Sequence, residues 1–194
     1  MARHQEFETD EALHQAMKVF WRKGYEATSI NDLLKATNLS KSSLYATFGG
    51  KRDLFLAAFD SYRDARKSEA IKILNQTPAR KGIEQFYKMI LEGAKADEFS
   101  NGCMSINQAV EMAPHDEDVR VRVKQDFQLM EKFLTQTIEQ GRLDGSVKGR
   151  KTARELSRIL VVAFPGLQVM VRAKCDQERL DEALQLVLSL LDEE

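Results

Sequence analysis

The residues best suited to chemistry lie between positions 41 and 51 and carry basic or hydroxyl groups. They are Lys41, Ser42, Ser43, Tyr45, Thr47 and Lys51. Ammonium and hydroxyl groups donate hydrogen bonds to phosphate oxygens, and they also contact base edges in a DNA groove. No aspartate or glutamate occurs between Asp32 and Asp53, so nothing acidic in this segment would repel an anion. The pattern therefore indicates local contact with a nucleic-acid backbone.

A short helix is expected just before this segment. Ile30, Leu33 and Leu34 follow the i, i+3, i+4 spacing of one apolar helix face. Ser29 precedes that face, and Asp32 stands three residues later, as in a capping box that opens a helix. The pattern predicts a helix that begins near residue 30.

A second short helix is expected to carry the donor groups. Thr37-Asn38 ends the first helix, because both side chains compete for backbone hydrogen bonds. Ser40 is the predicted N-cap of the second helix, and Leu44 and Phe48 anchor it at i, i+4 spacing. Ser42 then lies on the opposite face. The two segments predict a helix-turn-helix.

Lys51 gives a second indication of an anionic partner. Gly49-Gly50 interrupts the helical pattern, and a third helix is expected to begin near Lys51-Arg52. Cations at a helix N-terminus oppose the macrodipole by roughly 0.3–1 kcal/mol each. A bound phosphate would offset this conflict. The alternative is that Lys51 simply points into water.

Several spaced residues resemble the DNA-binding signature of TetR-family transcriptional regulators over roughly the first quarter of the chain. They are Gly24-Tyr25, Thr28-Ser29, Ser40-Lys41, Leu44-Tyr45, Phe48 and Lys51. The resemblance implies an all-helical homodimer that binds double-stranded operator DNA and releases it when a small-molecule effector binds. It also implies DNA contacts, from Thr28, Tyr45 and Lys51 to phosphates and from Lys41, Ser42, Ser43 and Thr47 to base edges.

The sequence departs from the family pattern at positions that bear on base recognition. Asn38-Leu39 stands where the family usually has Gly-Val, and Ser42-Ser43 stands where Lys-Gly is frequent. Residues 102–116 also resemble the regulatory domain of one TetR subgroup. The identity of the bases that are read stays open.

Composition restricts the class of protein. The chain has 194 residues, 43% hydrophobic content and a net charge of -1, so a globally basic protein is excluded. No window alternates with period two, which favours an all-α fold. Two cysteines without metal-site spacing predict no zinc site and no disulfide framework, and they favour a reducing cytoplasm. No cofactor is expected. The apolar run at 159–164 is far shorter than the ~20 residues of a membrane span, and no signal peptide is expected at the N-terminus.

The chain is expected to divide into a head and a body. The head, residues 1–51, is a predicted three-helix bundle whose first helix has Thr9 as its N-cap and ends at Gly24. Arg3 and His4 precede it as a short disordered arm. The body, residues 52–194, is a larger helical domain for effector binding and dimerisation. A connecting helix at about 52–75 joins the two, and Gln76-Thr77-Pro78 ends it.

The body should contain five further helices. Their apolar stripes cover 83–94, 102–113, 119–141, 156–171 and 180–191, and a polar loop is expected at 97–101. The last two are apolar over more than one face, which predicts burial on both sides. They are therefore the predicted dimer interface, with Leu156 and Leu160 among its residues. A well-buried monomer core is the alternative.

An apolar effector cavity is predicted within the body. Its expected wall is Phe59, Phe86, Ile90, Cys103, Ile106, Asn107, Phe127, Met130, Phe164 and Gln168. Asn107 and Gln168 would orient the ligand. Cys103 lies near a predicted helix N-terminus, where a thiolate is favoured, so a redox or electrophile sensor is one alternative. A small buried hydrophobic residue is the other.

Two further classes of protein are alternatives. A cysteine-dependent enzyme would use Cys103 as nucleophile with His115 and Asp116 as helpers, but only residue types support it. A helical interaction module would need no palindromic DNA. We expect no enzyme, and Cys175 is expected to take no part in function.

Overall fold

A computed structural model of the chain describes residues 2–93 and 101–192, with side chains at 9–91 and 101–192. Regular structure throughout these ranges is helical, which confirms the predicted all-α fold. The helices are α1 (Ala2–Lys23), α2 (Ile30–Thr37), α3 (Lys41–Phe48), α4 (Lys51–Leu74), α5 (Ala79–Gly93), α6 (Met104–Glu111), α7 (Glu117–Leu143), α8 (Ala153–Arg172) and α9 (Gln177–Ser189). The predicted polar loop at 97–101 lies almost wholly outside the described residues.

The helix-turn-helix forms where its caps predicted it. The Ser29 hydroxyl accepts a hydrogen bond from the Asp32 backbone, and the Asp32 carboxylate accepts one from the Ser29 backbone, which completes the capping box of α2. Ser40 caps α3 by accepting from the backbone N–H of Ser43. Asn38 follows α2 at φ 55°, in the left-handed region that asparagine tolerates. Local side-chain chemistry therefore fixes both ends of the turn.

The predicted start of the first helix is wrong. α1 begins at Ala2, so Thr9 lies inside the helix and Arg3 and His4 belong to it rather than to a disordered arm. Residues 2–8 contain no glycine or proline, and arginine, glutamine and glutamate are good helix formers. Nothing in the sequence stops the helix at Thr9. The predicted end is correct, because Gly24 follows α1 at φ +85°.

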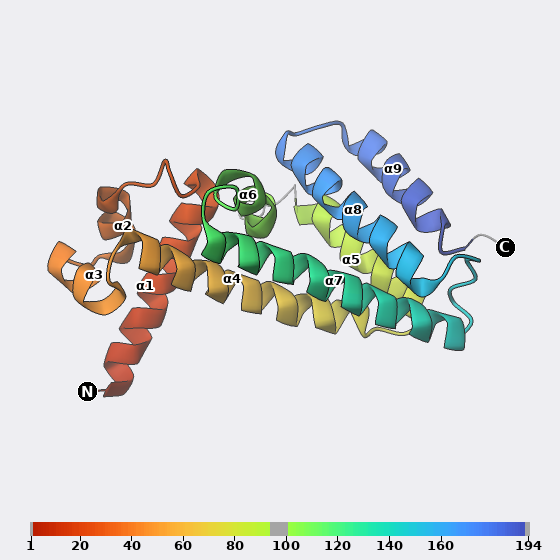
Figure 1. Cartoon of the computed structure of the whole chain (residues 1–194), viewed down its shortest axis with the longest axis horizontal. Coiled ribbons are helices and arrows are strands. Elements are labelled where there is room, and N and C mark those ends of the chain that lie inside the picture. Colours follow the sequence, from red (N-terminus) through yellow and green to blue (C-terminus); the bar gives the residue numbers. More distant parts are fainter. Residues whose placement is uncertain (1, 94–100, 193–194) are drawn as a thin grey trace.

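The long helix α4 belongs to both ends of the molecule (Figure 1). Its first half places Leu54, Phe55 and Phe59 in the same core as the buried residues of α1–α3. Met104 of α6 and Val119 of α7 also join that core. Packing therefore continues across the predicted boundary at residue 51, although the predicted connecting helix itself is present.

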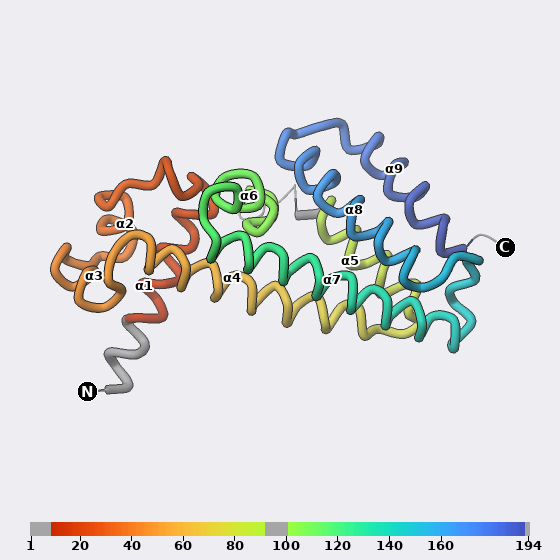
Figure 2. The backbone as a smooth tube through the Cα atoms, viewed as in Figure 1, coloured from red at the N-terminus to blue at the C-terminus, as the bar shows by residue number. Residues whose placement is uncertain are grey.

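The body is a bundle of α5, α7, α8 and α9, and the far half of α4 packs along its α5 and α7 side (Figure 2). Its core includes Tyr87, Leu134 and Ile138, which are fully buried. Helix α6 is shorter than predicted and ends at Glu111, and Asp116 caps α7 by accepting from the Val119 backbone. No helix in the described part of the chain is long and apolar enough to cross a membrane.

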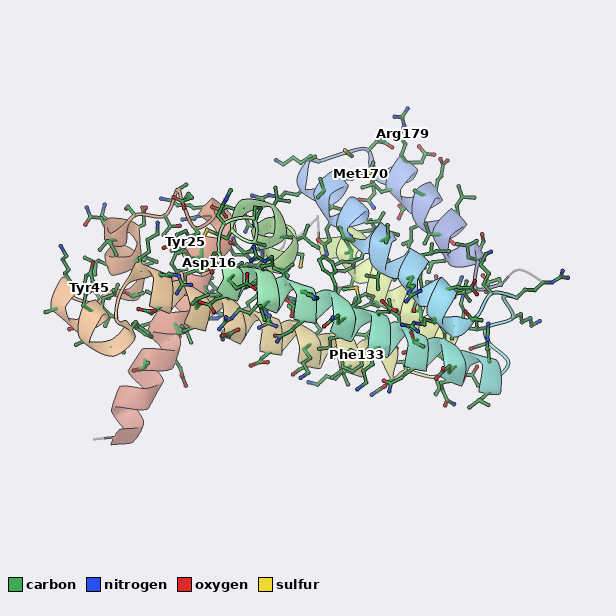
Figure 3. All side chains as sticks on the ribbon, viewed as in Figure 1. Tyr25, Tyr45, Asp116, Phe133, Met170 and Arg179 are labelled. Atoms are coloured by element: carbon green, nitrogen blue, oxygen red, sulfur yellow. The ribbon has the colours of Figure 1, made fainter. Side chains whose placement is uncertain are left out.

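The predicted interface residues Leu156 and Leu160 lie inside the chain's own core. Their exposed fractions are 1% and 2%, so they are not available to a partner and that assignment is wrong. The two C-terminal helices nevertheless expose apolar side chains elsewhere, which are Ile159, Val162, Val169, Met170 and Leu186. Met170 stands on the outer side of α8 in Figure 3. Helical periodicity correctly indicated that both helices have more than one apolar face. It did not distinguish the face that packs in the chain's own core from the face that is exposed.

Candidate DNA-binding surface and effector cavity

Helix α3 presents a polar surface at one end of the molecule. Leu44 is fully buried and fixes the helix against the head core, while Lys41, Ser42, Ser43 and Thr47 are exposed. Tyr45 is 45% exposed and projects outward in Figure 3. Five of the seven predicted DNA contacts thus share one exposed helix. Because these side chains are exposed, their donors are accessible to a DNA groove.

The hydroxyl groups at the start of α3 form a small cluster. Ser40 Oγ lies 2.9 Å from Ser42 Oγ and 2.8 Å from Ser43 Oγ. Each hydroxyl has one proton to donate and two lone pairs. The cluster therefore orients these groups while it leaves lone pairs and a hydroxyl proton for an external partner.

Thr28 does not have the role that the sequence suggested. Its exposed fraction is 1%, and its hydroxyl donates to the Gly24 carbonyl oxygen at 2.6 Å. A phosphate oxygen only accepts hydrogen bonds, and the single proton of Thr28 Oγ1 is already used. The predicted phosphate contact by Thr28 is therefore corrected to a structural bond that closes the turn after α1.

The two cations at the start of α4 have different surroundings. Lys51 Nζ lies 4.3 Å from the ring centroid of Tyr25, within the range of a cation–π contact. Arg52 instead bonds to acidic side chains of the body, with Arg52 Nε 3.0 Å from Asp116 Oδ2 and Arg52 Nη2 2.6 Å from Asp118 Oδ2. Asp53 adds a negative charge to the first turn. Lys51 is the cation that remains close to the α3 surface.

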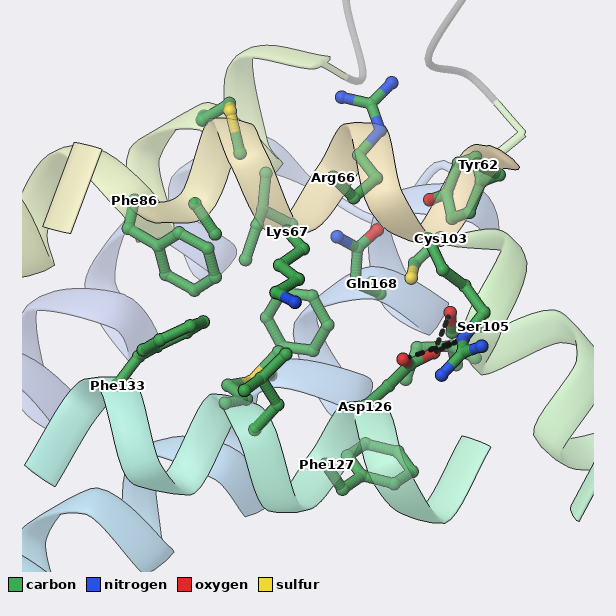
Figure 4. A pocket seen from close by; sticks show the side chains of 18 of the residues that line it. Tyr62, Arg66, Lys67, Phe86, Cys103, Ser105, Asp126, Phe127, Phe133 and Gln168 are labelled. Atoms are coloured by element: carbon green, nitrogen blue, oxygen red, sulfur yellow. Dashed lines mark hydrogen bonds and ion pairs between the residues drawn. The ribbon is translucent and has the colours of Figure 1, made fainter. Parts of the chain in front are cut away.

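The body contains a partly open cavity of about 150 Å³ between α4, α5, α6, α7 and α8 (Figure 4). Most of the predicted wall residues line it, namely Phe86, Ile90, Cys103, Ile106, Phe127, Met130, Phe164 and Gln168. Phe86 and Phe164 stack with ring centroids 5.8 Å apart, which gives the cavity a flat aromatic side. The arrangement suits a small molecule with an apolar body.

Two predicted wall residues lie elsewhere. Phe59 is fully buried in the head-side core, where its ring stacks on Phe55 at 5.8 Å. Asn107 Nδ2 donates to the Asn101 carbonyl oxygen at 3.0 Å, so this amide holds the loop before α6. Neither residue lines the cavity. Apolar or amide character alone does not say which side of a helix faces a hollow.

Charged residues line one side of the cavity, and sequence reasoning missed them. Arg63 Nε lies 2.8 Å from Asp126 Oδ1, and Ser105 Oγ donates to Asp126 Oδ2 at 2.8 Å (Figure 4). Burial raises the pKa of Asp126, because the charged form loses water. Arg66 and Lys67 also line the wall. The helical spacing of positions 63, 66 and 67 was a signal that could have placed them on one face.

Cys103 is at the predicted helix terminus, but its thiol is not activated there. It is the N-cap residue of α6 and lines the cavity. Burial is the main cause that raises the pKa of the Cys103 thiol above its ordinary value. Desolvation therefore outweighs the expected stabilisation of a thiolate by the helix N-terminus.

Hydrogen bonds connect the cavity wall to the head, and they too were not predicted. Trp21 Nε1 donates to the Gly102 carbonyl oxygen at 2.8 Å, and the Met104 backbone N–H donates to Tyr62 Oη at 3.1 Å. Trp21, Tyr62 and Gly102 all line the cavity. At the other end of α6, the Glu26 backbone N–H donates to Glu111 Oε1 at 2.9 Å.

The residues proposed for an enzyme do not gather at the cavity. Cys103 lines it, whereas His115 and Asp116 do not. Asp116 caps α7 and pairs with Arg52, and the hydrogen bond from Arg52 is the main cause that lowers the pKa of its carboxyl. Within the described ranges, no group of three or more His, Cys, Asp or Glu side chains is placed to hold a metal ion.

Two sequence families match consecutive parts of the chain. Residues 12–58 match bacterial regulatory proteins of the tetR family, and residues 79–187 match the tetracyclin repressor-like C-terminal domain. The chain is 32% identical to YezE of Bacillus subtilis, an uncharacterized HTH-type transcriptional regulator, over 99% of this chain and 100% of YezE. It is 30% identical to the HTH-type transcriptional repressor ComR of Escherichia coli, over 96% of this chain and 90% of ComR.

Solved structures agree with these matches. A cysteine mutant of the TetR-family transcriptional regulator CifR, complexed with 26-base-pair operator DNA, has a TM-score of 0.81 and 29% identity. The match covers 92% of this chain and 94% of that one. A TetR transcriptional regulator from Chloroflexus aurantiacus has a TM-score of 0.86 at 22% identity, covering 100% and 98% of the two chains, and supports the fold alone.

Proposed function

Because the chain belongs to the tetR family of bacterial regulatory proteins, we propose that it represses transcription as a ligand-released homodimer on a palindromic operator. The coarser assignment, a DNA-binding transcriptional regulator, follows from the family and its repressor relatives. The exposed donor surface of α3 is the observation that carries the proposal. The buried anchor Leu44 holds that surface in a fixed position.

Each donor on α3 has a proposed part in DNA binding. Lys41, Ser42, Ser43 and Thr47 contact base edges, where lysine suits the acceptors of guanine and serine accepts several bases. Tyr45 and Lys51 contact phosphates and set the register of the helix in the groove. Thr28 supports these residues from inside the turn through its bond to Gly24.

Dimerisation is proposed through the exposed apolar face of α8 and α9. Val162 and Leu186 are 77% and 73% exposed, and Val169 is 53% exposed. Large apolar side chains on neighbouring helices favour burial against a second copy in a two-fold arrangement. Such a dimer would set two α3 helices about 34–36 Å apart, one turn of DNA.

Release is proposed to begin at the cavity. An effector can shift the protein only if it binds one conformation better than the other. The cavity residues Trp21 and Tyr62 bond directly to the segment 102–104 at the start of α6. Ligand-induced movement of that segment would therefore act on α1 and α4, which support α3.

Selection of bound duplexes from a random pool, at about 0.15 M salt to weaken non-specific phosphate binding, tests the proposal. We expect an enriched palindrome. Lys41→Ala should weaken binding to it by roughly tenfold or more, since a base contact contributes about 1–3 kcal/mol. Lys132→Ala, at an exposed position on α7, is the matched control and should bind as the wild type does. Folded protein that enriches no sequence would sink the proposal.

A second candidate differs only in how the effector is sensed. Cys103 on the cavity wall favours covalent capture of an electrophile, although its raised pKa limits the thiolate fraction. Cys103→Ser separates the two versions. Release from the operator that survives this substitution supports reversible binding, whereas release that disappears supports the thiol. Catalytic turnover forms no part of either version.

A further inference from the structure

The charged side chains on the cavity wall do not balance. Arg63, Arg66 and Lys67 are cationic, and Asp126 is the one carboxylate that lines the cavity among the described residues. Two positive charges are therefore in excess on a wall that is otherwise mostly apolar. An excess charge beside an apolar hollow attracts a ligand of opposite sign.

Two of the cations are already occupied. Arg63 pairs with Asp126 through Nε at 2.8 Å and with Asp60 through Nη1 at 2.8 Å. Arg66 pairs with Glu69 at 2.5 Å, and its guanidinium carbon lies 5.5 Å from the ring centroid of Trp21. These groups have protein partners that compensate their charge.

Lys67 is different from both arginines. Across residues 9–91 and 101–192, its ammonium group has no hydrogen bond or ion pair with another side chain or with the backbone. Figure 4 shows the Lys67 side chain leaving α4, with its nitrogen in the space between α4 and α7. Lys67 is exposed, so this charge stands at the mouth of the cavity. It is the unused cation of the site.

Asp126 cannot serve a cationic ligand in the same way. Its two oxygens accept from Arg63 at 2.8 and 3.0 Å, and Oδ2 also accepts from Ser105 at 2.8 Å. Its negative charge is therefore compensated inside the wall.

Gln168, on α8, has an amide that makes no hydrogen bond to the described residues and can donate to a ligand.

The apolar part of the cavity limits the size of the ligand. A cavity of about 150 Å³ lined by apolar side chains is large enough to hold benzene. The stacked pair Phe86 and Phe164 offers a flat surface to an aromatic ring. Shape and charge together indicate one ring with one acidic group.

We propose that the effector is a small aromatic carboxylate whose ring occupies the apolar side of the cavity and whose anion pairs with Lys67. This inference rests on the proposed effector site and adds the chemical class of its ligand. The carboxylate would accept a charge-assisted hydrogen bond from Lys67 Nζ, and the Gln168 amide would supply a second donor.

The chain contains its own reporter of cavity occupancy. Trp21 is the single tryptophan, and it lines the cavity. Its fluorescence can be titrated with three probes that share one ring and chain length, namely 3-phenylpropanoate, the neutral 3-phenylpropanamide and the cationic 3-phenylpropylamine. We expect the acid to bind about tenfold more tightly than the amide, which corresponds to about 1.4 kcal/mol, and the amine to bind most weakly.

Lys67→Met should remove this preference while amide binding stays unchanged. Lys132→Met, an exposed lysine of α7 outside the cavity, should retain the preference. Raising the salt from about 0.05 to about 0.5 M should weaken binding of the acid and leave the amide unaffected. Both substitutions are at exposed positions, so the folded state should persist, which a thermal melt checks.

Equal affinity for acid and amide, or an acid preference that survives Lys67→Met, would overturn the inference. Absence of binding by all three probes would overturn it as well. None of these results bears on operator recognition, which is measured with DNA and without probe. A protein that selects a palindrome but shows no acid preference would thus retain the proposed function and lose only the ligand class.

Discussion

Besides the shared apolar core, two sets of polar contacts connect the α1–α3 end of the molecule to the body, and they are built differently. We call the first the α6 joint, which comprises the bonds from Trp21 to Gly102, from Met104 to Tyr62 and from Glu26 to Glu111. The second is the α4–α7 seam, in which Arg52 pairs with Asp116 and Asp118, and Arg122 pairs with Asp60. The bonds of Trp21 and Tyr62 in the joint are buried, whereas the seam is formed by partly exposed charges.

This difference indicates that the joint could pass a structural change from the cavity to the head, whereas the seam only attaches the head to the body. Trp21, Tyr62 and Gly102 are also cavity wall, so a ligand that moves the wall must disturb the α6 joint. The residues of the α4–α7 seam do not line the cavity, and exposed ion pairs tolerate small displacements at little cost. Under the proposed release mechanism, the joint would carry a change in the cavity to the head, while the seam would only hold the two together.

The largest effect is expected from Trp21→Ala. Trp21 is 5% exposed and contacts Tyr62 edge-on at 5.1 Å, so the substitution leaves a void and an unpaired Gly102 carbonyl. The free energy of unfolding should fall by about 3–5 kcal/mol. Urea unfolding followed by circular dichroism measures this, with Arg22→Ala, the exposed neighbour, as control. A loss below about 1 kcal/mol would mean that the joint contributes little to folding.

A smaller loss is expected from Tyr62→Phe. The change removes the oxygen that accepts from the buried backbone N–H of Met104, which then has no partner. Leaving a buried donor unsatisfied costs about 1–3 kcal/mol. Tyr45→Phe removes the same atom from an exposed ring and should be nearly neutral for stability. Equal effects of the two substitutions on the urea midpoint would mean that the hydrogen bond between Tyr62 and Met104 does not contribute to stability.

The smallest effect is expected in the pH dependence of the seam. Arg52 lowers the pKa of Asp116 below its ordinary value of about 4, so this pair stabilises the fold above about pH 4. Its contribution is lost as the pH falls through the lowered pKa. Arg52→Met should therefore flatten the acid side of the stability profile.

Asp126 should affect the pH dependence of stability in the opposite direction. Burial raises its pKa, so its cost to stability appears as the pH rises through that raised pKa and is absent below the ordinary value. Asp126→Asn should remove this dependence. Unfolding midpoints measured across about pH 3–7 distinguish the two changes, and identical profiles for both variants would contradict the contrast between seam and cavity.

The features predictable from sequence were those fixed by neighbouring residues. The capping box of Ser29 and Asp32 and the cap by Ser40 depend on spacings of three residues, and the structure has them. The exposed face of α3 follows from the register of Leu44. Most of the apolar residues predicted from the sequence for the cavity wall do line it, because helical periodicity places them on inward faces.

The remaining features depend on contacts between distant parts of the chain. Trp21 and Gly102 are 81 positions apart, and no local pattern pairs them. Phe59 looked like a wall residue because it is aromatic, but its side of α4 faces α1 and the head core. The sequence did not indicate a role for Lys67, because a charged residue on a long helix is usually solvated. Only its position beside the cavity indicates that it could bind a ligand.

The backbone conformation and close contacts of Gly24 predict the result of a genetic screen. A side chain there would have to tolerate φ +85°, and its first carbon would lie 2.7 Å from Glu111 Oε1. The residue therefore does more than end α1, because it leaves room for the carboxylate that ties α6 to the turn. In a screen for mutants that ignore inducer, substitutions at this position should recur although they alter neither α3 nor the cavity wall. Such alleles would identify a site where communication fails while recognition and sensing are both intact.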